Sequence, residues 1–350
     1  MLRSGLWSNP VSMNLSEQEW SDIYELAHYH SVEAVVFDAV AMMSDRCQPQ
    51  YGLKIIWINE TICLERWNRR MDGEISHFIR QMESLDIECR LLKGRAISAC
   101  YINPNRRISG DVDIYFEGEN FEKAIEWAKK WGMREILRQG EKHIVLYYHE
   151  ILWEFHHTLI IFSLNVFNKR FKKMLLSASN FAPSILILDN SVIVKTFEPT
   201  FNVLYIFCHL FKHAVNGNIG LRHYCDLSRL IWKEREVIDW SRLENYLTLL
   251  SLKNFFLACG ALMTEHLGLP KKCFLMELNS KDSKSGKLLL KSAMESGNFG
   301  AIRQKIGMPM LVRKIYNFAH ILTVTIRFIK IAPLESPFNL FIRIKTFLFS

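Results

Sequence analysis

Four short strand-like segments are grouped between residues 87 and 157 of a 350-residue chain whose remaining length has mostly helical periodicity. The last two segments are separated only by His149-Glu150, which predicts a hairpin. The order strand, helix, strand, helix and hairpin is typical of an α/β (α+β) module built on a small mixed β-sheet. The predicted strands cover residues 87–92, 111–116, 143–148 and 151–157, with helices at 95–101 and 121–131 between them.

Helical regions flank this module on both sides. Amphipathic periodicity predicts helices between residues 15 and 85, the first of them capped by Asn14 or Ser16. The second half is expected to contain strand-like runs at 185–188 and 192–194, helices at 201–214, 221–232 and 240–267, and a polar, loosely packed segment at 280–300. The predicted division is an N-terminal helical region (1–84), a core (85–165), a C-terminal helical domain (166–300) and a basic apolar helical tail (301–350).

Three carboxylates lie on the predicted strands of the module. Asp111 and Asp113 are two residues apart, so their side chains point to the same face with Cα atoms roughly 7 Å apart. Glu154 stands between Trp153 and Phe155, where an acid is costly unless it has a partner or a function. Carboxylates this close repel each other, and hard oxygen ligands suit Mg²⁺ or Mn²⁺. The pattern predicts a divalent metal site of the kind used for in-line phosphoryl and nucleotidyl displacement.

The same stretch of chain carries a resemblance to a known family. The residues that carry it are Leu91-Leu92-Lys93-Gly94, Tyr101, Arg107, Ser109-Gly110-Asp111-Val112-Asp113, Gly132, His143 and Glu154-Phe155-His156. Together they resemble the uncharacterised bacterial nucleotidyltransferase family of the DNA polymerase beta-like nucleotidyltransferase superfamily, best over residues 85–160 and more loosely over 15–270. The resemblance implies a polymerase-beta-like core in which Asp111, Asp113 and Glu154 are catalytic and hold Mg²⁺ or Mn²⁺ around a nucleoside triphosphate (NTP).

A second set of residues is expected to bind the phosphates of the nucleotide: Lys93, Gly94, Arg107, Ser109 and Gly110. Gly94 lets the backbone approach a phosphate closely, and Arg107 is a better bidentate donor than Lys93. Both cations have an alternative role as salt-bridge partners of the acid cluster. The superfamily places a Gly-Ser or Gly-Gly turn at the triphosphate, whereas Lys93-Gly94-Arg95 lacks the second small residue, so the phosphate contacts are expected to differ in detail.

Six further polar residues are candidates to line the site: His143, His156, His209, His213, Arg222 and Asp226. His156 shares a strand face with Glu154 and is either a hydrogen-bond donor to a carboxylate or a polar core residue. His209 and His213 are four residues apart, as are the arginine and the aspartate, so each pair shares one face of a predicted helix. These pairs line a cleft that faces the core, or they are packing histidines and a surface ion pair. A His-x-x-x-His pair can also bind zinc, but no third ligand is evident.

The net charge of +8 is concentrated at the C-terminal end. Residues 301–350 contain eight basic residues and one acidic residue, which leaves about +1 for the first 300 residues. A body with so little positive charge argues against a long nucleic-acid substrate. Apolar residues are interspersed with the basic ones in the tail, so it either packs on the body as a helix pair or makes a peripheral contact with an anionic membrane.

The remaining sequence features predict a cytoplasmic protein. No segment has the pattern of a signal peptide, and none has the roughly 18 consecutive apolar residues that a membrane span requires. The eight cysteines are scattered without a Cys-x-x-Cys pair, which favours free thiols in a reducing compartment over a zinc or disulfide framework.

The predicted activity is metal-dependent transfer of a nucleoside monophosphate from an NTP such as ATP to an unidentified hydroxyl or phosphate acceptor, with release of pyrophosphate. The settings of the resembling family suggest a sugar, a small molecule or a protein as the acceptor. The alternative is a non-catalytic NTP-binding, regulatory or interaction module of an envelope-biosynthesis assembly. On the sequence alone, Asp113→Asn is expected to abolish catalysis while barely changing the fold.

Overall fold

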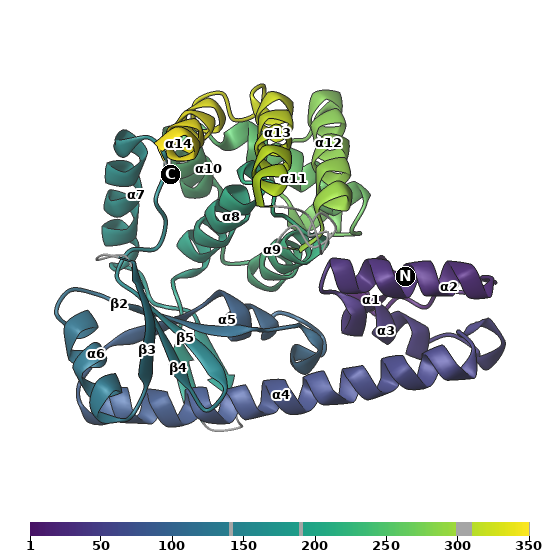
Figure 1. Cartoon of the computed structure of the whole chain (residues 1–350), viewed down its shortest axis with the longest axis horizontal. Helices are drawn as coiled ribbons and strands as arrows, with labels where there is room; N and C mark the ends of the chain where they lie inside the picture. Colours follow the sequence, from purple (N-terminus) through teal and green to yellow (C-terminus); the bar gives the residue numbers. More distant parts are fainter. Residues whose placement is uncertain (140–142, 189–191, 299–309, 350) are drawn as a thin grey trace.

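The computed structural model describes residues 1–139, 143–188, 192–298 and 310–349, and it places a small β-sheet between one long helix and a helical domain (Figure 1). The long helix α4 (Tyr51–Ser84) runs along the bottom of the view, beneath the sheet at one end and the N-terminal helices at the other. The N-terminal helices are α1 (Leu2–Trp7), α2 (Glu17–Tyr29) and α3 (Glu33–Ala41). The helical domain contains α7 (Asn165–Ala178), α8 (Pro199–Val215), α9 (Leu221–Glu234), α10 (Trp240–Leu249), α11 (Lys253–Glu265), α12 (Ser280–Ser296), α13 (Met310–Phe328) and α14 (Glu335–Phe349).

Within the described residues, five strands form one mixed sheet in the order β1-β2-β5-β4-β3. The strands are β1 (Cys89–Leu92), β2 (Asp111–Phe116), β3 (Arg134–Gln139), β4 (His143–Tyr148) and β5 (Ile151–His156), with α5 (Lys93–Ser98) and α6 (Asn120–Lys130) inserted between them. Only the β2–β5 pairing is parallel among these neighbours. A separate two-stranded ribbon consists of β6 (Ile185–Leu188) and β7 (Val192–Lys195). The mixed α/β fold class predicted from the sequence is confirmed.

One face of the sheet packs against helices and forms a second apolar core. Ile114 and Phe116 alternate inward from β2 and join Phe155 of β5 in a core that α4 and α6 close. Phe78 of α4 stands at its centre, with its ring 5.4 Å from that of Phe155 and 5.2 Å from that of Trp153. Because this face is apolar and closed, the residues that alternate with it must point to the opposite face, toward the helical domain.

Two segments of the helical domain differ from the prediction, one in its packing and one in its division into helices. Residues 280–296 form the well-packed helix α12, not a loose segment, because Asn279 and Asp282 make a capping box and Gly286 lets α12 approach the backbone of α11. The predicted helix 240–267 is divided into α10 and α11 by Ser251, which has a φ of 57°. The bond from Leu252 N to Leu247 O ends α10 without any glycine or proline that the sequence could have revealed.

The short N-terminal helix α1 and two further elements, β3 and α7, were not predicted from the sequence. β3 is an edge strand with exposed side chains at Ile136 and Leu137 and a register shift between Glu135 and Leu137, so it lacks the alternation that identifies half-buried strands. α7 buries Phe167 and Phe171 against the helical domain. The capping alternatives at the first predicted helix are decided in favour of Ser16, whose hydroxyl accepts from the backbone of Glu19.

The C-terminal helices pack on the helical domain through a set of buried side chains. Val324 and Phe328 of α13 are fully buried, and the Phe328 ring meets Phe255 of α11 edge-on at 5.4 Å. Glu335 is buried and accepts hydrogen bonds from Lys212 of α8 and from the backbone of Ser163. None of the described helices combines the length and the apolarity that crossing a membrane would require. The predicted boundary at residues 300 and 301, and the basic residues Arg303 and Lys305, lie outside the described residues.

Candidate active site

The three acids predicted from the sequence meet on the open face of the sheet. β2 and β5 are parallel neighbours, and Asp113 is directly opposite Glu154 in their register. Asp111 precedes Asp113 by two residues on the same face and lines the same cavity, whereas the group of ligand atoms that lie within 4.8 Å of one another belongs to Asp113, Glu154 and His156. The flanking residues Val112 and Phe155 point into the closed core. The alternation that buries the apolar face therefore fixes all three carboxylates on the opposite one.

Asp113 is the most deeply buried member of this acid cluster, which consists of Asp111, Asp113 and Glu154. Its side chain is 2% exposed, and its Oδ1 lies 2.8 Å from Lys93 Nζ and 2.8 Å from His156 Nε2. Burial would raise the pKa of Asp113, but the Lys93 ammonium and then His156 hold it well below its usual range. The Asp113 carboxylate is thus ionised, and its charge is already compensated within the protein.

The other two acids are more accessible. Burial, and then the neighbouring Asp113, raises the pKa of Asp111 to about 6. The side chain of Glu154 is 27% exposed, and its Oε2 lies 3.2 Å from His156 Nε2. His156 therefore bridges two of the three acids, and although burial opposes its charge, hydrogen bonding to Asp113 and Glu154 raises its pKa. This placement agrees with a donor to carboxylates and not with an isolated polar core residue.

A strained turn brings Lys93 to the acid cluster. Lys93 follows β1 directly and has a φ of 40°, and Gly94 has a φ of 20°. A Cβ at Gly94 would lie 3.3 Å from the carbonyl oxygen of Asp111, so the turn and β2 are in close contact there. Arg95 points away from this turn and pairs with Asp72 of α4 at 2.7 Å. Arg95 is therefore committed to α4 and does not extend the Lys93-Gly94 turn into the cavity.

Arg107 joins the core to the helical domain. Its Nη2 lies 2.7 Å from Asp226 Oδ2 of α9, and Tyr101 donates to the other oxygen of the same carboxylate at 2.8 Å. Arg107 Nη1 also contacts the hydroxyl of Ser109 at 3.2 Å. Arg222 donates to the carbonyl of Ile108 at 3.2 Å. Asp226 thus pairs with Arg107 in the interior, and the alternative of a surface pair between Arg222 and Asp226 is wrong.

These groups line one cavity of about 270 Å³ between the open face of the sheet and helices α8 and α9. Its wall includes the acid cluster, the Lys93-Gly94 turn, Arg107, Gly110, Arg222, Asp226, His143 and His156. Ser109 is buried behind this wall, where it accepts from Arg107, and it is not among the residues that line the cavity. Carboxylates and cationic side chains therefore share one enclosed space, as a site for a metal ion and a polyphosphate requires.

Residues 16–268 match a family described as uncharacterised nucleotidyltransferases. The chain belongs to this family. The match covers every residue of the cavity wall and ends before α12. A crystal structure of an antigenic nucleotidyltransferase-like protein from Paracoccidioides brasiliensis is 14% identical, covers 60% of this chain and 94% of that chain, and has a TM-score of 0.36. Among curated proteins, none matches this chain significantly.

The helical domain of this family member adds three histidines to the same cavity: His209, His213 and His223. The first two were candidates from the sequence, and the third was not. His223 lies in the first turn of α9, directly after Arg222. The sequence feature that could have identified His223 was the short connection between α8 and α9, residues 216–220. A short connection makes two helices neighbours and brings the start of α9 close to the end of α8.

Proposed function

We propose that this protein is a metal-dependent nucleotidyltransferase. It transfers a nucleoside monophosphate from an NTP to a hydroxyl or phosphate acceptor and releases pyrophosphate. The observation that carries the proposal is the placement of Asp111, Asp113 and Glu154 side by side on adjacent parallel strands, at the wall of a cavity that also holds cationic side chains. Membership of the nucleotidyltransferase family supports the same kind of reaction.

The acid cluster fits a hard divalent cation such as Mg²⁺ or Mn²⁺. All three groups offer carboxylate oxygens, the ligands that these ions prefer. The pKa of Asp111 is raised to about 6, with burial and repulsion from Asp113 as its largest causes, and a nearby cation would relieve that repulsion. When bound, the ion supplies positive charge to the phosphate oxygens and the developing negative charge.

The remaining groups of the wall have complementary tasks. Lys93, Arg107 and Arg222 neutralise the triphosphate, although Arg107 shares its guanidinium with Asp226. An acceptor oxygen attacks the α-phosphorus, a new P–O bond forms, and the bond to the bridging oxygen of the leaving pyrophosphate breaks. Glu154 is accessible in the cavity and takes the proton of an acceptor hydroxyl. His156 orients Glu154 and Asp113 through its contacts with both.

The acceptor class follows from the charge of the chain. The excess positive charge lies in the C-terminal tail, so the body lacks the extended basic character that long nucleic acids require. A sugar, another small molecule or a protein side chain is the proposed acceptor. A non-catalytic module that binds a metal–NTP complex is the competing function, because Asp113 is already neutralised by Lys93 and His156.

A transfer screen distinguishes the two functions. The purified full-length chain is incubated with each of the four α-labelled NTPs, with Mg²⁺ or Mn²⁺, and with fractionated cell extract as the source of acceptors. We expect the label to enter an acceptor, with equimolar pyrophosphate, only when the divalent ion is present. A chain that binds the metal–NTP complex but releases no pyrophosphate with any fraction would be a binding module.

We propose that the main role of the C-terminal tail is to stabilise the folded body of the protein. Its inward side is part of the core, whereas the outward side chains of Ile326 and Phe341 are each 65% exposed. A peripheral contact with an anionic membrane would have to use this outward side together with the basic residues around it.

Two phenylalanines of the tail separate these roles. Phe328→Ala should lower the free energy of unfolding by about 3–5 kcal/mol, because it empties a fully buried site against Phe255. Phe341→Ala, the matched control, should leave stability nearly unchanged. Denaturant unfolding measures both, and flotation with anionic vesicles measures membrane binding. Salt-sensitive flotation that Phe341→Ala abolishes would assign the tail to the membrane instead.

A further inference from the structure

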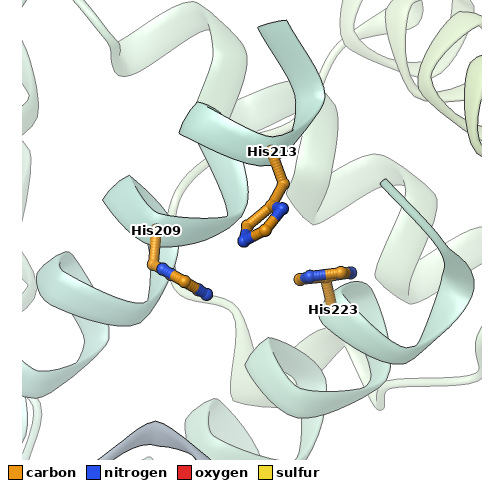
Figure 2. A group of neighbouring side chains, drawn as sticks. All are labelled: His209, His213 and His223. Atoms are coloured by element: carbon orange, nitrogen blue, oxygen red, sulfur yellow. The ribbon is translucent and has the colours of Figure 1, made fainter. Parts of the chain in front are cut away.

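Three histidine rings from two helices face a common space (Figure 2). His209 and His213 lie one turn apart on α8, and His223 lies in the first turn of α9. The ring centroids of His213 and His209 are 4.5 Å apart, and those of His213 and His223 are 4.6 Å apart. All three residues line the same cavity as the acid cluster. We call them the histidine cluster.

The nitrogen atoms are close enough to share one metal ion. One ring nitrogen from each histidine lies within 4.8 Å of the other two. A tetrahedral ion with Zn–N bonds of roughly 2.1 Å needs nitrogens roughly 3.4 Å apart, so metal binding would draw the three rings closer together. Two histidines at i and i+4 on one helix with a third from a neighbouring helix provide three ligands, and the fourth position stays open.

The backbone at the start of α9 holds one of the rings in place. His223 Nδ1 lies 3.4 Å from both the backbone nitrogen and the carbonyl oxygen of Gly220, the residue that caps α9. A backbone contact of this kind is common at one ring nitrogen of a ligating histidine, because it fixes the orientation of the ring. A Cβ at Gly220 would lie 2.7 Å from the backbone nitrogen of Asn298, so glycine is required for the close packing that holds this cap in place.

The electrostatics of the cavity favour neutral imidazoles. Burial lowers the pKa of all three histidines, that of His213 to about 4, and the nearby charges of Lys93 and Arg222 act in the same direction. A neutral imidazole has the lone pair that a metal needs, whereas a site for phosphate would need protonated rings. The cavity wall also contains four carboxylates and three lysine or arginine side chains, so the positive charges near the histidines are offset within the same cavity.

We propose that His209, His213 and His223 bind a divalent transition-metal ion of the zinc class, with an open coordination position directed into the cavity of the acid cluster. Nitrogen ligands distinguish this site from the oxygen-rich site for Mg²⁺ or Mn²⁺. The open position takes an oxygen ligand, either water or a phosphate or hydroxyl oxygen of a bound substrate. Metal binding by the histidines does not depend on the proposed transfer reaction, whereas the use of the open position by a substrate does.

Titration with Co²⁺ alone tests the site, because tetrahedral Co²⁺ has a characteristic visible spectrum. The full-length chain is freed of metal with a chelator, titrated with Co²⁺ in the absence of nucleotide, and then titrated with Zn²⁺ to displace the bound ion. We expect one equivalent of tetrahedral Co²⁺ that Zn²⁺ displaces. Loss of a residue that only supports a metal ligand typically weakens metal binding about 10–100-fold. His209→Gln and His223→Gln each remove a ligand itself and should weaken Co²⁺ binding at least as much.

Two control variants exclude other binding sites. Glu154→Gln removes a ligand from the second group that could hold a metal, Asp113, Glu154 and His156, and should leave the Co²⁺ spectrum unchanged. His149→Gln replaces a half-exposed histidine of the β4–β5 turn and should also have no effect. Circular dichroism verifies the fold of each variant, and His209→Gln remains decisive if His223→Gln fails to fold.

The outcomes separate this proposal from the transfer reaction. Equal Co²⁺ affinity of the wild type, His209→Gln and His223→Gln would overturn the metal site, as would loss of the spectrum in Glu154→Gln alone. A chain that binds Co²⁺ through its histidines but transfers no nucleotide would retain the metal site and lose the proposed function. Transfer with Mg²⁺ that is unaffected by both histidine variants, combined with no Co²⁺ binding, would do the reverse.

Discussion

Replacing Asp111 by Asn should reduce nucleotidyl transfer by more than about a hundredfold, because removal of one metal-binding carboxylate forfeits roughly 3 kcal/mol of charge stabilisation. The fold should not suffer. Asp111 is a partly buried acid whose charge is opposed by burial and by Asp113, and its pKa is raised to about 6. An amide of the same shape removes that repulsion, so the metal-free variant should unfold at the same temperature as the wild type or at a higher one.

Asp113→Asn is the informative contrast. Its side chain pairs with Lys93 at 2.8 Å and is 2% exposed, so the amide would leave an ammonium group buried without its counter-ion. Breaking such a pair from one side typically costs about 3–5 kcal/mol. The ion pair therefore changes the expectation from the sequence that this variant barely affects the fold. We expect Asp113→Asn to lose both activity and stability, and Asp111→Asn to lose activity alone.

Thermal unfolding in chelator and transfer assays with Mg²⁺ measure the two effects on the same samples. His149→Gln is the control substitution outside the cavity, because His149 lies in the exposed turn between β4 and β5. Full activity of Asp111→Asn would remove this residue from the metal site. Equal stability of the two variants would mean that the Lys93–Asp113 pair contributes little to folding.

The acid cluster could be predicted because it is encoded by local patterns. Two acids at i and i+2 on a strand must share a face, and Glu154 between two large apolar residues must face away from their core. The strand β2 has the bounds that were predicted, residues 111–116, and β5 ends one residue earlier than predicted. The complete strand order β1-β2-β5-β4-β3 was not predicted, since strand order depends on contacts between segments distant in the chain.

The ion-pair partners of Lys93 and Arg107 could not be predicted, for the same reason. Lys93 and Arg107 both had an ion-pair alternative, but nothing local indicates that Lys93 selects Asp113 and that Arg107 selects Asp226, 119 residues away. His223 was missed because it lies on α9, whereas His209 and His213 lie on α8, so no spacing within one helix connects the three residues. Its approach to the other histidines is a property of the α8–α9 packing.

The ion pair between Arg107 and Asp226 predicts a large loss of stability when one partner is removed. Both side chains are less than 10% exposed, and the carboxylate accepts from Arg107 through two nitrogens and from the Tyr101 hydroxyl. Asp226→Ala would leave the guanidinium buried and without its main partner, at a cost of about 3–5 kcal/mol. The exposed pair of Lys123 and Glu119 is the control, and Lys123→Ala should cost less than about 1 kcal/mol.

A double variant separates charge from packing. In Arg107→Met/Asp226→Leu neither side chain carries a charge, so most of the lost stability should return, because replacing a buried ion pair by apolar residues is often neutral. Nucleotide binding should not return with it, since Arg107 is the proposed phosphate ligand. Denaturant unfolding and the KM for the NTP measure the two properties.

The double variant shows whether the ion pair between Arg107 and Asp226 contributes to NTP binding or only to stability. Arg107 precedes β2 and Asp226 lies on α9, so their bond spans the cavity between the sheet and the helical domain. A stable double variant with weak NTP binding would show that the guanidinium is retained for the phosphate and that Asp226 positions it. Recovery of both stability and NTP binding would show that the pair is only a structural contact. Lys93 and Arg222 would then be the remaining candidates for binding the phosphates.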